Sequence, residues 1–112
     1  MITYSIVYRD PEKYCTFPSI ISLGVNRLLL SFREAGKWSV RAAKENRVVH
    51  QATDSTCYVI SSEDGGRTWK KETKNQVYHG KYGINDAALT RLKNGELLLR
   101  LNEIEVRRSP ER

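Results

Sequence analysis

Short apolar runs separated by polar turn residues dominate the hydropathy pattern of this chain. The runs are rich in Ile, Val, Leu, Tyr and Thr, and Gly, Asn, Asp and Pro punctuate them. The 3.6-residue period of an amphipathic helix is hard to find, so the pattern predicts an all-β protein of antiparallel strands. We expect strands near residues 2–8, 17–23, 27–33, 56–62, 68–73, 87–92 and 96–101.

Residues 36–55 break this pattern, because they show no clear period. They are interpreted as a long insertion between two strands. Long loops in compact domains are usually either functional or disordered, and the sequence leaves both alternatives open.

Two of the predicted hairpins are near copies of each other, about 70 residues apart. Self-similarity at a fixed offset is typical of stacked or radial repeats. Each hairpin contains three consecutive leucines, and such a run suits a strand that is covered on both faces, as in a blade between neighbouring blades. The matching residues are Leu23 with Leu92, Leu28-Leu29-Leu30 with Leu97-Leu98-Leu99, and an upstream Val7-Tyr8 with Val77-Tyr78.

A polar turn, residues 62–69, lies between two predicted strands. Each of its characteristic residues has a physical role in forming the turn. Asp64 can accept backbone N–H bonds, and the adjacent glycines permit positive φ. Thr68 and Trp69 are expected to begin the returning strand, with Trp69 folded into the packing. Replacing such a buried Trp by Ala costs about 3 to 5 kcal/mol. The turn is therefore interpreted as structural.

This turn resembles the Asp-box of the BNR repeats in sialidases (neuraminidases) and other six-bladed β-propellers. The resemblance extends along nearly the whole chain and implies that residues 1–112 are a partial sialidase-like propeller domain of antiparallel blades. A first blade would span about residues 15–80, and a second, incomplete blade about residues 84–112, so that the chain would stop inside a blade. The Asp-box positions are Ser62, Asp64, Gly66, Thr68 and Trp69.

The resemblance also implies a chemistry. Sialidases hold the substrate carboxylate with three arginines, use a Tyr activated by a Glu as nucleophile, and protonate the leaving group with an Asp. Where the family has the first of these arginines, in an Arg-Ile-Pro motif, this chain has Thr16-Phe17-Pro18. The remaining members belong to later blades. We therefore expect no catalytic residue in this chain and no sialidase turnover by it.

Four candidate ligand-binding residues follow from the same resemblance: Arg33, Glu34, His50 and Asp54. Arg33 and Glu34 lie near where the family lines its central cleft, and a solvated pair at the rim is the alternative. His50 and Asp54 precede the Asp-box strand, where the family has its acid/base Asp, and an exposed loop His and a turn Asp are the alternatives.

Other polar residues are expected to have structural roles. Asn85 and Asp86 are expected to form a turn or cap pair. Cys15 and Cys57 are expected on strands separated by a third strand, about 10 Å apart, which is too far for a disulfide. Two His and two separated Cys do not have the spacing of a metal site, so no metal or other cofactor is expected.

The net charge of +6 favours acidic partners such as anionic sugars, nucleic acid or phospholipid. The basic residues are scattered and no nucleic-acid-binding motif accompanies them, so a nucleic-acid partner is not expected. No apolar run is long enough to cross a membrane and no signal peptide is visible, which predicts a cytoplasmic chain as written and no membrane partner.

Three interpretations are open at this point. The first is a truncated sialidase-like glycoside hydrolase that is catalytically incompetent alone. The second is a glycan-binding, lectin-like module that completes a propeller by homo-oligomerisation, with Tyr14, Trp38, Tyr78 and Tyr82 as candidate sugar platforms. The third is an unrelated basic β-sandwich. An isolated piece of a propeller should also self-associate through its open blade edges.

Overall fold

Two antiparallel sheets and one short helix make up the described part of the chain, which is residues 2–47 and 53–103 of a computed structural model. The first sheet has four strands in the order β1-β2-β3-β4, and the second is the hairpin β5-β6. The elements in chain order are β1 (Tyr14–Gly24), β2 (Arg27–Ala35), α1 (Lys37–Lys44), β3 (Thr56–Ser62), β4 (Lys70–Tyr78), β5 (Ala87–Arg91) and β6 (Leu97–Leu101).

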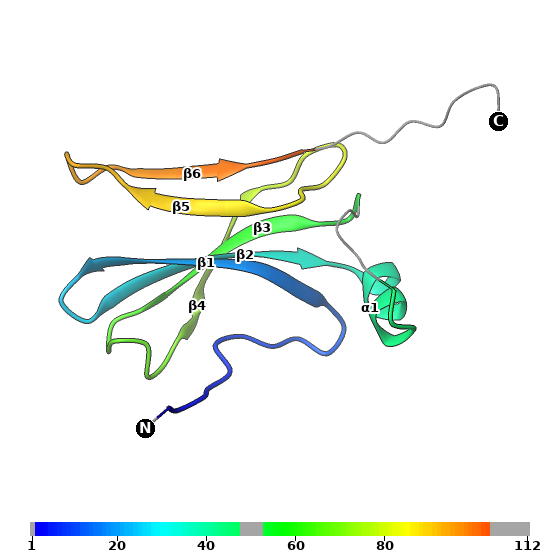
Figure 1. Cartoon of the computed structure of the whole chain (residues 1–112), viewed down its shortest axis with the longest axis horizontal. Coiled ribbons are helices and arrows are strands. Elements are labelled where there is room, and N and C mark those ends of the chain that lie inside the picture. The colour runs from blue at the N-terminus through cyan, green and yellow to red at the C-terminus, as the bar shows by residue number, and fades with distance from the viewer. Residues whose placement is uncertain (1, 48–52, 104–112) are drawn as a thin grey trace.

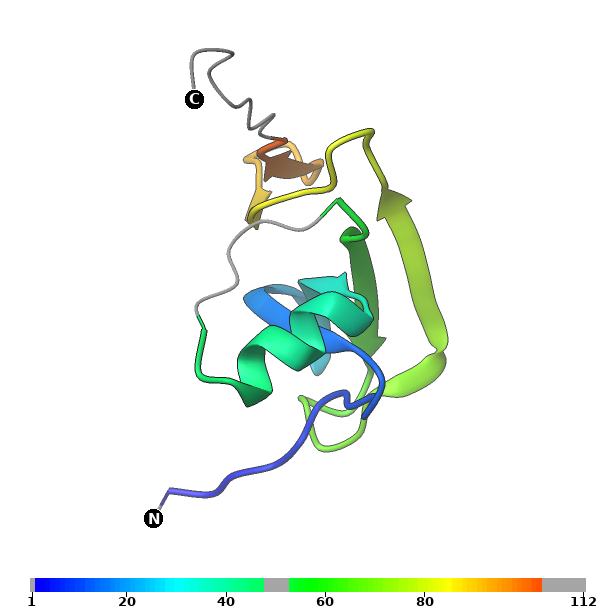
Figure 2. The ribbon, with the colours of Figure 1, turned by 90° about the vertical axis from the view of Figure 1, so that its right-hand side faces the viewer.

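The elements form layers, with the β5-β6 hairpin over one face of the first sheet and the N-terminal segment along the opposite face (Figure 1). The view at right angles shows the same order, with the first sheet between the other two (Figure 2). Helix α1 lies at one end of the first sheet, between the end of β2 and the start of β3. The all-β class is confirmed, with this helix as an addition.

Most of the predicted strands are present, and Thr56–Ser62 has the predicted bounds. The strand predicted at residues 68–73 instead runs from Lys70 to Tyr78. The strand predicted at residues 2–8 is wrong, because that segment is paired with no strand of the described chain. Its apolar side chains Ile2, Tyr4 and Ile6 are largely exposed.

Helix α1 corrects the interpretation of residues 36–55 as an insertion without regular structure. Only Ser39 and Ala42 are buried along its eight residues. The helix has only eight residues, fewer than the window of about 11 to 18 residues over which a helical period is recognised in a sequence. Gly36 at its N-terminal boundary makes no side-chain cap.

The first sheet has an apolar cluster on each face. On one face, which we call face A, Leu30, Phe32 and Ile60 pack together with Trp69 and the N-terminal Tyr8. On the other, face B, Cys57 packs against Ile84 and Ala87, together with Leu99 and Leu101. The last four residues belong to the second unit, which is the hairpin β5-β6 with the residues just before it. Side chains alternate between faces along a strand, so neighbouring residues of β2 and β3 serve different clusters.

The two leucine runs have different environments. Leu28-Leu29-Leu30 on β2 is covered on both faces, as the unbroken apolar run predicts. Leu98 on β6 is 52% exposed, because only one face of the hairpin lies against the first sheet. Leu97 shares the covered face with Leu99 and Leu101 but is still 44% exposed at the start of the strand.

The expected separation of the cysteines is confirmed. Cys15 lies opposite Glu34, and Cys57 lies opposite Arg33, so β2 separates them. Because Arg33 and Glu34 are consecutive residues of one strand, the two thiols also lie on opposite faces of the sheet. Both cysteines are free.

Candidate functional site

The two ends of the sheets carry different kinds of residues. One end holds the turns between β1 and β2, between β3 and β4, and between β5 and β6. The other end holds α1 and the residues around Arg33, Asp54 and His79. The first end has a structural network, and the second carries the candidate ligand-binding residues.

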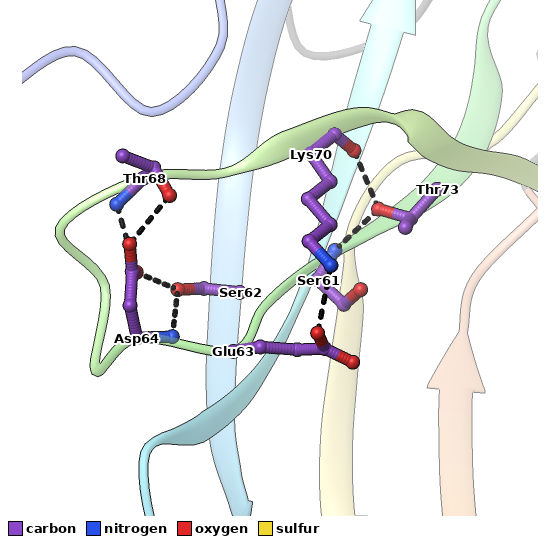
Figure 3. A network of polar contacts seen from close by, with 7 residues as sticks. All are labelled: Ser61, Ser62, Glu63, Asp64, Thr68, Lys70 and Thr73. Carbon is purple, nitrogen blue, oxygen red and sulfur yellow. Dashed lines mark hydrogen bonds and ion pairs between the residues drawn. The ribbon is translucent and has the colours of Figure 1, made fainter.

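The Asp-box turn is a closed hydrogen-bond network (Figure 3). Asp64 accepts a bond from the Thr68 N–H at 2.9 Å and another from the Thr68 hydroxyl at 2.5 Å. The Ser62 hydroxyl donates to Asp64 Oδ1 at 2.9 Å and accepts from the Gly66 N–H at 2.9 Å. The bonds from the Thr68 hydroxyl and then from its N–H lower the pKa of Asp64 to about 2.

The glycines of this turn adopt the positive φ that the sequence predicts, 72° at Gly65 and 89° at Gly66. Gly65 N also donates to Asn26 O at 2.8 Å, which ties the Asp-box to the β1-β2 turn. Trp69 lies just before β4 and is only partly buried, although it does pack against the face A cluster.

Arg33 is buried on face B, with 1% of its surface exposed. Its Cζ lies 5.2 Å from the centroid of the Phe17 ring. Burial lowers the pKa of Arg33, against the opposing effects of Tyr14 and Asp54. The alternative of a solvated pair at the rim is therefore wrong for Arg33.

Arg33 also lies directly across from Thr16, the position at which the resemblance implies an arginine. The next residues of β1 form an irregularity in the pairing with β2, and Phe17 adopts a positive φ of 55° there. Backbone in this region is strained for a residue other than glycine. A guanidinium is thus present beside the expected place, on the neighbouring strand.

Glu34 is also buried, at 5% exposure, and its side chain lies on the opposite face of the sheet, face A. Lys74 Nζ lies 2.9 Å from Glu34 Oε2 and 2.8 Å from the Tyr8 hydroxyl. The ammonium also lies 4.6 Å from the Tyr8 ring centroid and 4.2 Å from that of Tyr58. Burial opposes the charge on Lys74, but its bonds to Tyr8 and Glu34 outweigh this and raise its pKa. The solvated pair is therefore wrong for Glu34 as well.

Asp54 is exposed and lies against the start of α1. Its Oδ2 occupies the space into which a Cβ at Gly36 would project. A side chain at residue 36 would therefore have to displace this carboxylate. His50 lies outside the described residues.

Basic side chains from α1 line a hollow of about 490 Å³ at this end of the molecule. Lys37, Arg41 and Lys44 contribute positive charge, and Glu12 and Glu45 contribute negative charge. Trp38, on the same helix, is 54% exposed, and the guanidinium carbon of Arg47 lies 5.9 Å from its ring centroid.

Tyr78 and Glu103 are in direct contact, whereas Tyr8 and Glu34 are joined through Lys74, and the sequence analysis missed both arrangements. The Tyr78 hydroxyl donates to Glu103 Oε2, and the Tyr82 N–H donates to Glu103 Oε1 at 2.9 Å. This hydrogen bond raises the pKa of Tyr78 and lowers that of Glu103. The repeated Val-Tyr pair was the available signal, together with a Glu that follows each Tyr at a similar distance.

Asn85 and Asp86 join the two ends of the second hairpin. Asn102 donates its side-chain amide to Asp86 Oδ1 at 2.9 Å, and Asn85 N donates to Asn102 O at 2.8 Å. The expectation of a structural turn or cap pair is consistent with these bonds.

His79 is engaged by neighbouring polar groups. Its Nδ1 lies 2.7 Å from Thr56 Oγ1 and 3.0 Å from Ser55 O. Within residues 2–47 and 53–103, no three His, Cys, Asp or Glu side chains gather closely enough to hold a metal ion. In the same ranges, α1 is too short and too polar to span a bilayer.

Comparisons with known proteins give one structural relative. No family model matches the chain, and no curated protein matches it. It is similar to a protein of unknown function from Dyadobacter fermentans DSM 18053, at 29% sequence identity and a TM-score of 0.69. The match covers 84% of this chain and 25% of the other, so this chain spans about a quarter of the length of its relative.

Proposed function

We propose that this chain forms part of a sialidase-like β-propeller and binds anionic glycans without hydrolysing them. The observation that carries the proposal is the packing of the β5-β6 hairpin over a face of the hairpin β1-β2, which it resembles in sequence. Leu89 N on β5 donates to Ser19 Oγ on β1 at 3.0 Å, which brings equivalent strands of the two units together. Repeated antiparallel units that pack face to face are typical of a propeller.

The Asp-box supports the same architecture, because its polar network closes within the turn and leaves Asp64 fully engaged with Ser62 and Thr68. The relative from Dyadobacter fermentans is about four times as long as the part of it aligned with this chain, which leaves room for further units. A ring of several blades needs such a length.

The α1 end of the sheets is the proposed place of binding. An exposed aromatic ring beside a guanidinium, as in Trp38 with Arg47, suits the apolar face and the carboxylate of an acidic sugar. Lys37, Arg41 and Lys44 add positive charge nearby. Arg33 is too deeply buried to clamp a substrate carboxylate in this arrangement, and the catalytic set of the family is not found among the described residues.

Binding is tested by calorimetry with 3′-sialyllactose and with neutral lactose as the control ligand. We expect binding of the sialylated sugar only, its loss in Trp38→Ala and its retention in Trp38→Phe. Val25→Ala, at an exposed turn at the other end of the sheet, is the matched control and should bind normally. Equal affinity for both sugars, or none for either, would contradict the glycan proposal.

Hydrolysis is tested separately with a fluorogenic sialoside. We expect no turnover. Turnover that is lost in Arg33→Ala would overturn the proposal that this chain is not hydrolytic.

A further inference from the structure

The residues that form face A have counterparts in the second unit, about 70 residues later in the chain. The counterparts occupy equivalent places on β5, on β6 and just before β5. The pairs are Cys15 with Ile84, Pro18 with Ala87, Leu30 with Leu99, and Phe32 with Leu101.

The second set is covered by the first sheet. Ile84 and Ala87 are only 2% and 9% exposed, and together with Leu99 and Leu101 they pack against Cys57 on face B. The corresponding surface of the second unit is therefore a formed interface between two sheets.

The first set is covered by no sheet. Leu30 and Phe32 are 9% and 4% exposed because the N-terminal Val7 and Tyr8 and the ring of Trp69 pack against their cluster. The residues of this set line an open pocket of about 290 Å³, which the N-terminal Val7 and Tyr8 close only in part. Ile20, beside this pocket, is 52% exposed, whereas its counterpart Leu89 is partly buried and hydrogen-bonds to Ser19 through its N–H. Face A thus lacks the sheet that the equivalent surface of the second unit has.

A matching free surface exists on the outer face of the β5-β6 hairpin. Leu98 alternates with Leu99 and Leu101, so it points away from the first sheet and is 52% exposed. Its counterpart Leu29 lies on face B, which the hairpin of the same chain covers.

We propose that the outer face of the β5-β6 hairpin of one copy docks on face A of a second copy. Within the chain, β1-β2 presents face B to β5-β6. Because β5-β6 is a near copy of β1-β2, the outer face of β5-β6 corresponds to face B. This outer face therefore fits face A of another chain, as face B of β1-β2 fits the inner face of β5-β6. The contact joins two different surfaces, so it is head-to-tail rather than symmetric. It uses sheet faces rather than open edges and does not depend on glycan binding.

Sedimentation velocity over a concentration series tests the proposal with Ile20→Lys and Leu98→Lys. Both residues are exposed, so neither substitution disturbs the packed cores, and circular dichroism checks that each variant is folded. We expect association of the natural chain, and monomers for each variant alone.

An equimolar mixture of the two variants gives the sharper test. The Ile20→Lys chain keeps an intact hairpin face and the Leu98→Lys chain keeps an intact face A, so the mixture should form a dimer that cannot extend. Val25→Lys, at a turn outside both surfaces, should associate like the natural chain. A natural chain that stays monomeric, folded variants that associate normally, or a mixture that stays monomeric would each overturn the proposal.

Discussion

Lys74 Nζ lies 2.9 Å from Glu34 Oε2 and joins the outer strand β4 to the end of β2 on face A. The same ammonium also donates to the Tyr8 hydroxyl at 2.8 Å, which holds the N-terminal segment against the sheet. The side chain of Glu34 is 5% exposed and that of Lys74 is 21% exposed. Both charges are largely shielded from water, so each depends on the other for its stabilisation.

We therefore expect Lys74→Met to lower the free energy of unfolding by about 2 to 3 kcal/mol, because it leaves a buried carboxylate without its cation. Urea denaturation measures this change. The double variant Glu34→Gln/Lys74→Met removes both charges and should recover part of the loss. A single variant as stable as the natural chain would show that the ion pair contributes nothing.

Asp64 predicts a loss of stability in acid. Its pKa is about 2 in the folded chain, below the ordinary value of 3.8, so its contribution is complete above pH 4 and is lost as the pH falls through about 2. We expect Asp64→Asn to lower the melting temperature at pH 7 and to remove this acid-dependent component between pH 4 and pH 2. Melting curves across this range test both effects.

Glu63→Gln is the matched control for Asp64. It breaks an exposed ion pair with Lys70, and exposed pairs contribute little to stability. If both variants had the same melting temperature and pH dependence, the Asp-box network would not be the cause of the acid effect.

Gly66 and Gly95 form a matched pair for testing the packing of the Asp-box turn. Their φ angles are 89° and 87°, so alanine is strained at both, by about 1 to 2 kcal/mol. A Cβ at Gly66 would also lie 3.2 Å from Leu28 Cδ1, whereas nothing lies within 4 Å at Gly95. We expect the larger loss of unfolding free energy for Gly66→Ala. Equal losses in chemical denaturation would assign the whole effect to the backbone.

Both thiols are predicted to react slowly. Burial raises the pKa of Cys15 and that of Cys57 to about 11, so at pH 8 the thiolate fraction is on the order of one in a thousand. We expect iodoacetamide to label the folded chain slowly and the urea-unfolded chain rapidly. Val25→Cys, on an exposed turn, provides the fast-reacting folded control.

Oxidation gives a second readout for the cysteines. No intramolecular disulfide should form in the folded chain, because Cys15 and Cys57 lie on opposite faces of the sheet. An intramolecular disulfide found by mass spectrometry of the folded, oxidised chain would contradict this arrangement.

The hairpins and the Asp-box turn could be predicted because their signals are local. Alternating and continuous apolar runs define strands, and Gly65 and Gly66 mark a turn that needs positive φ. Helix α1 was missed for a local reason as well, because its eight residues are too few for a helical period to stand out in the sequence.

The sequence by itself determined the strand pairing of each hairpin, the separation of the two cysteines and the internal repeat, since each depends on residues close in the chain or on direct comparison of segments. Only the tertiary structure decided that Arg33 is buried and that Glu34 binds Lys74 on the opposite face. It also decided that one face of the second hairpin is covered and the other free. These features depend on which sheet lies over which face, and that contact joins residues far apart in the sequence. The sequence pattern shows that such residues are apolar but not which residues they contact.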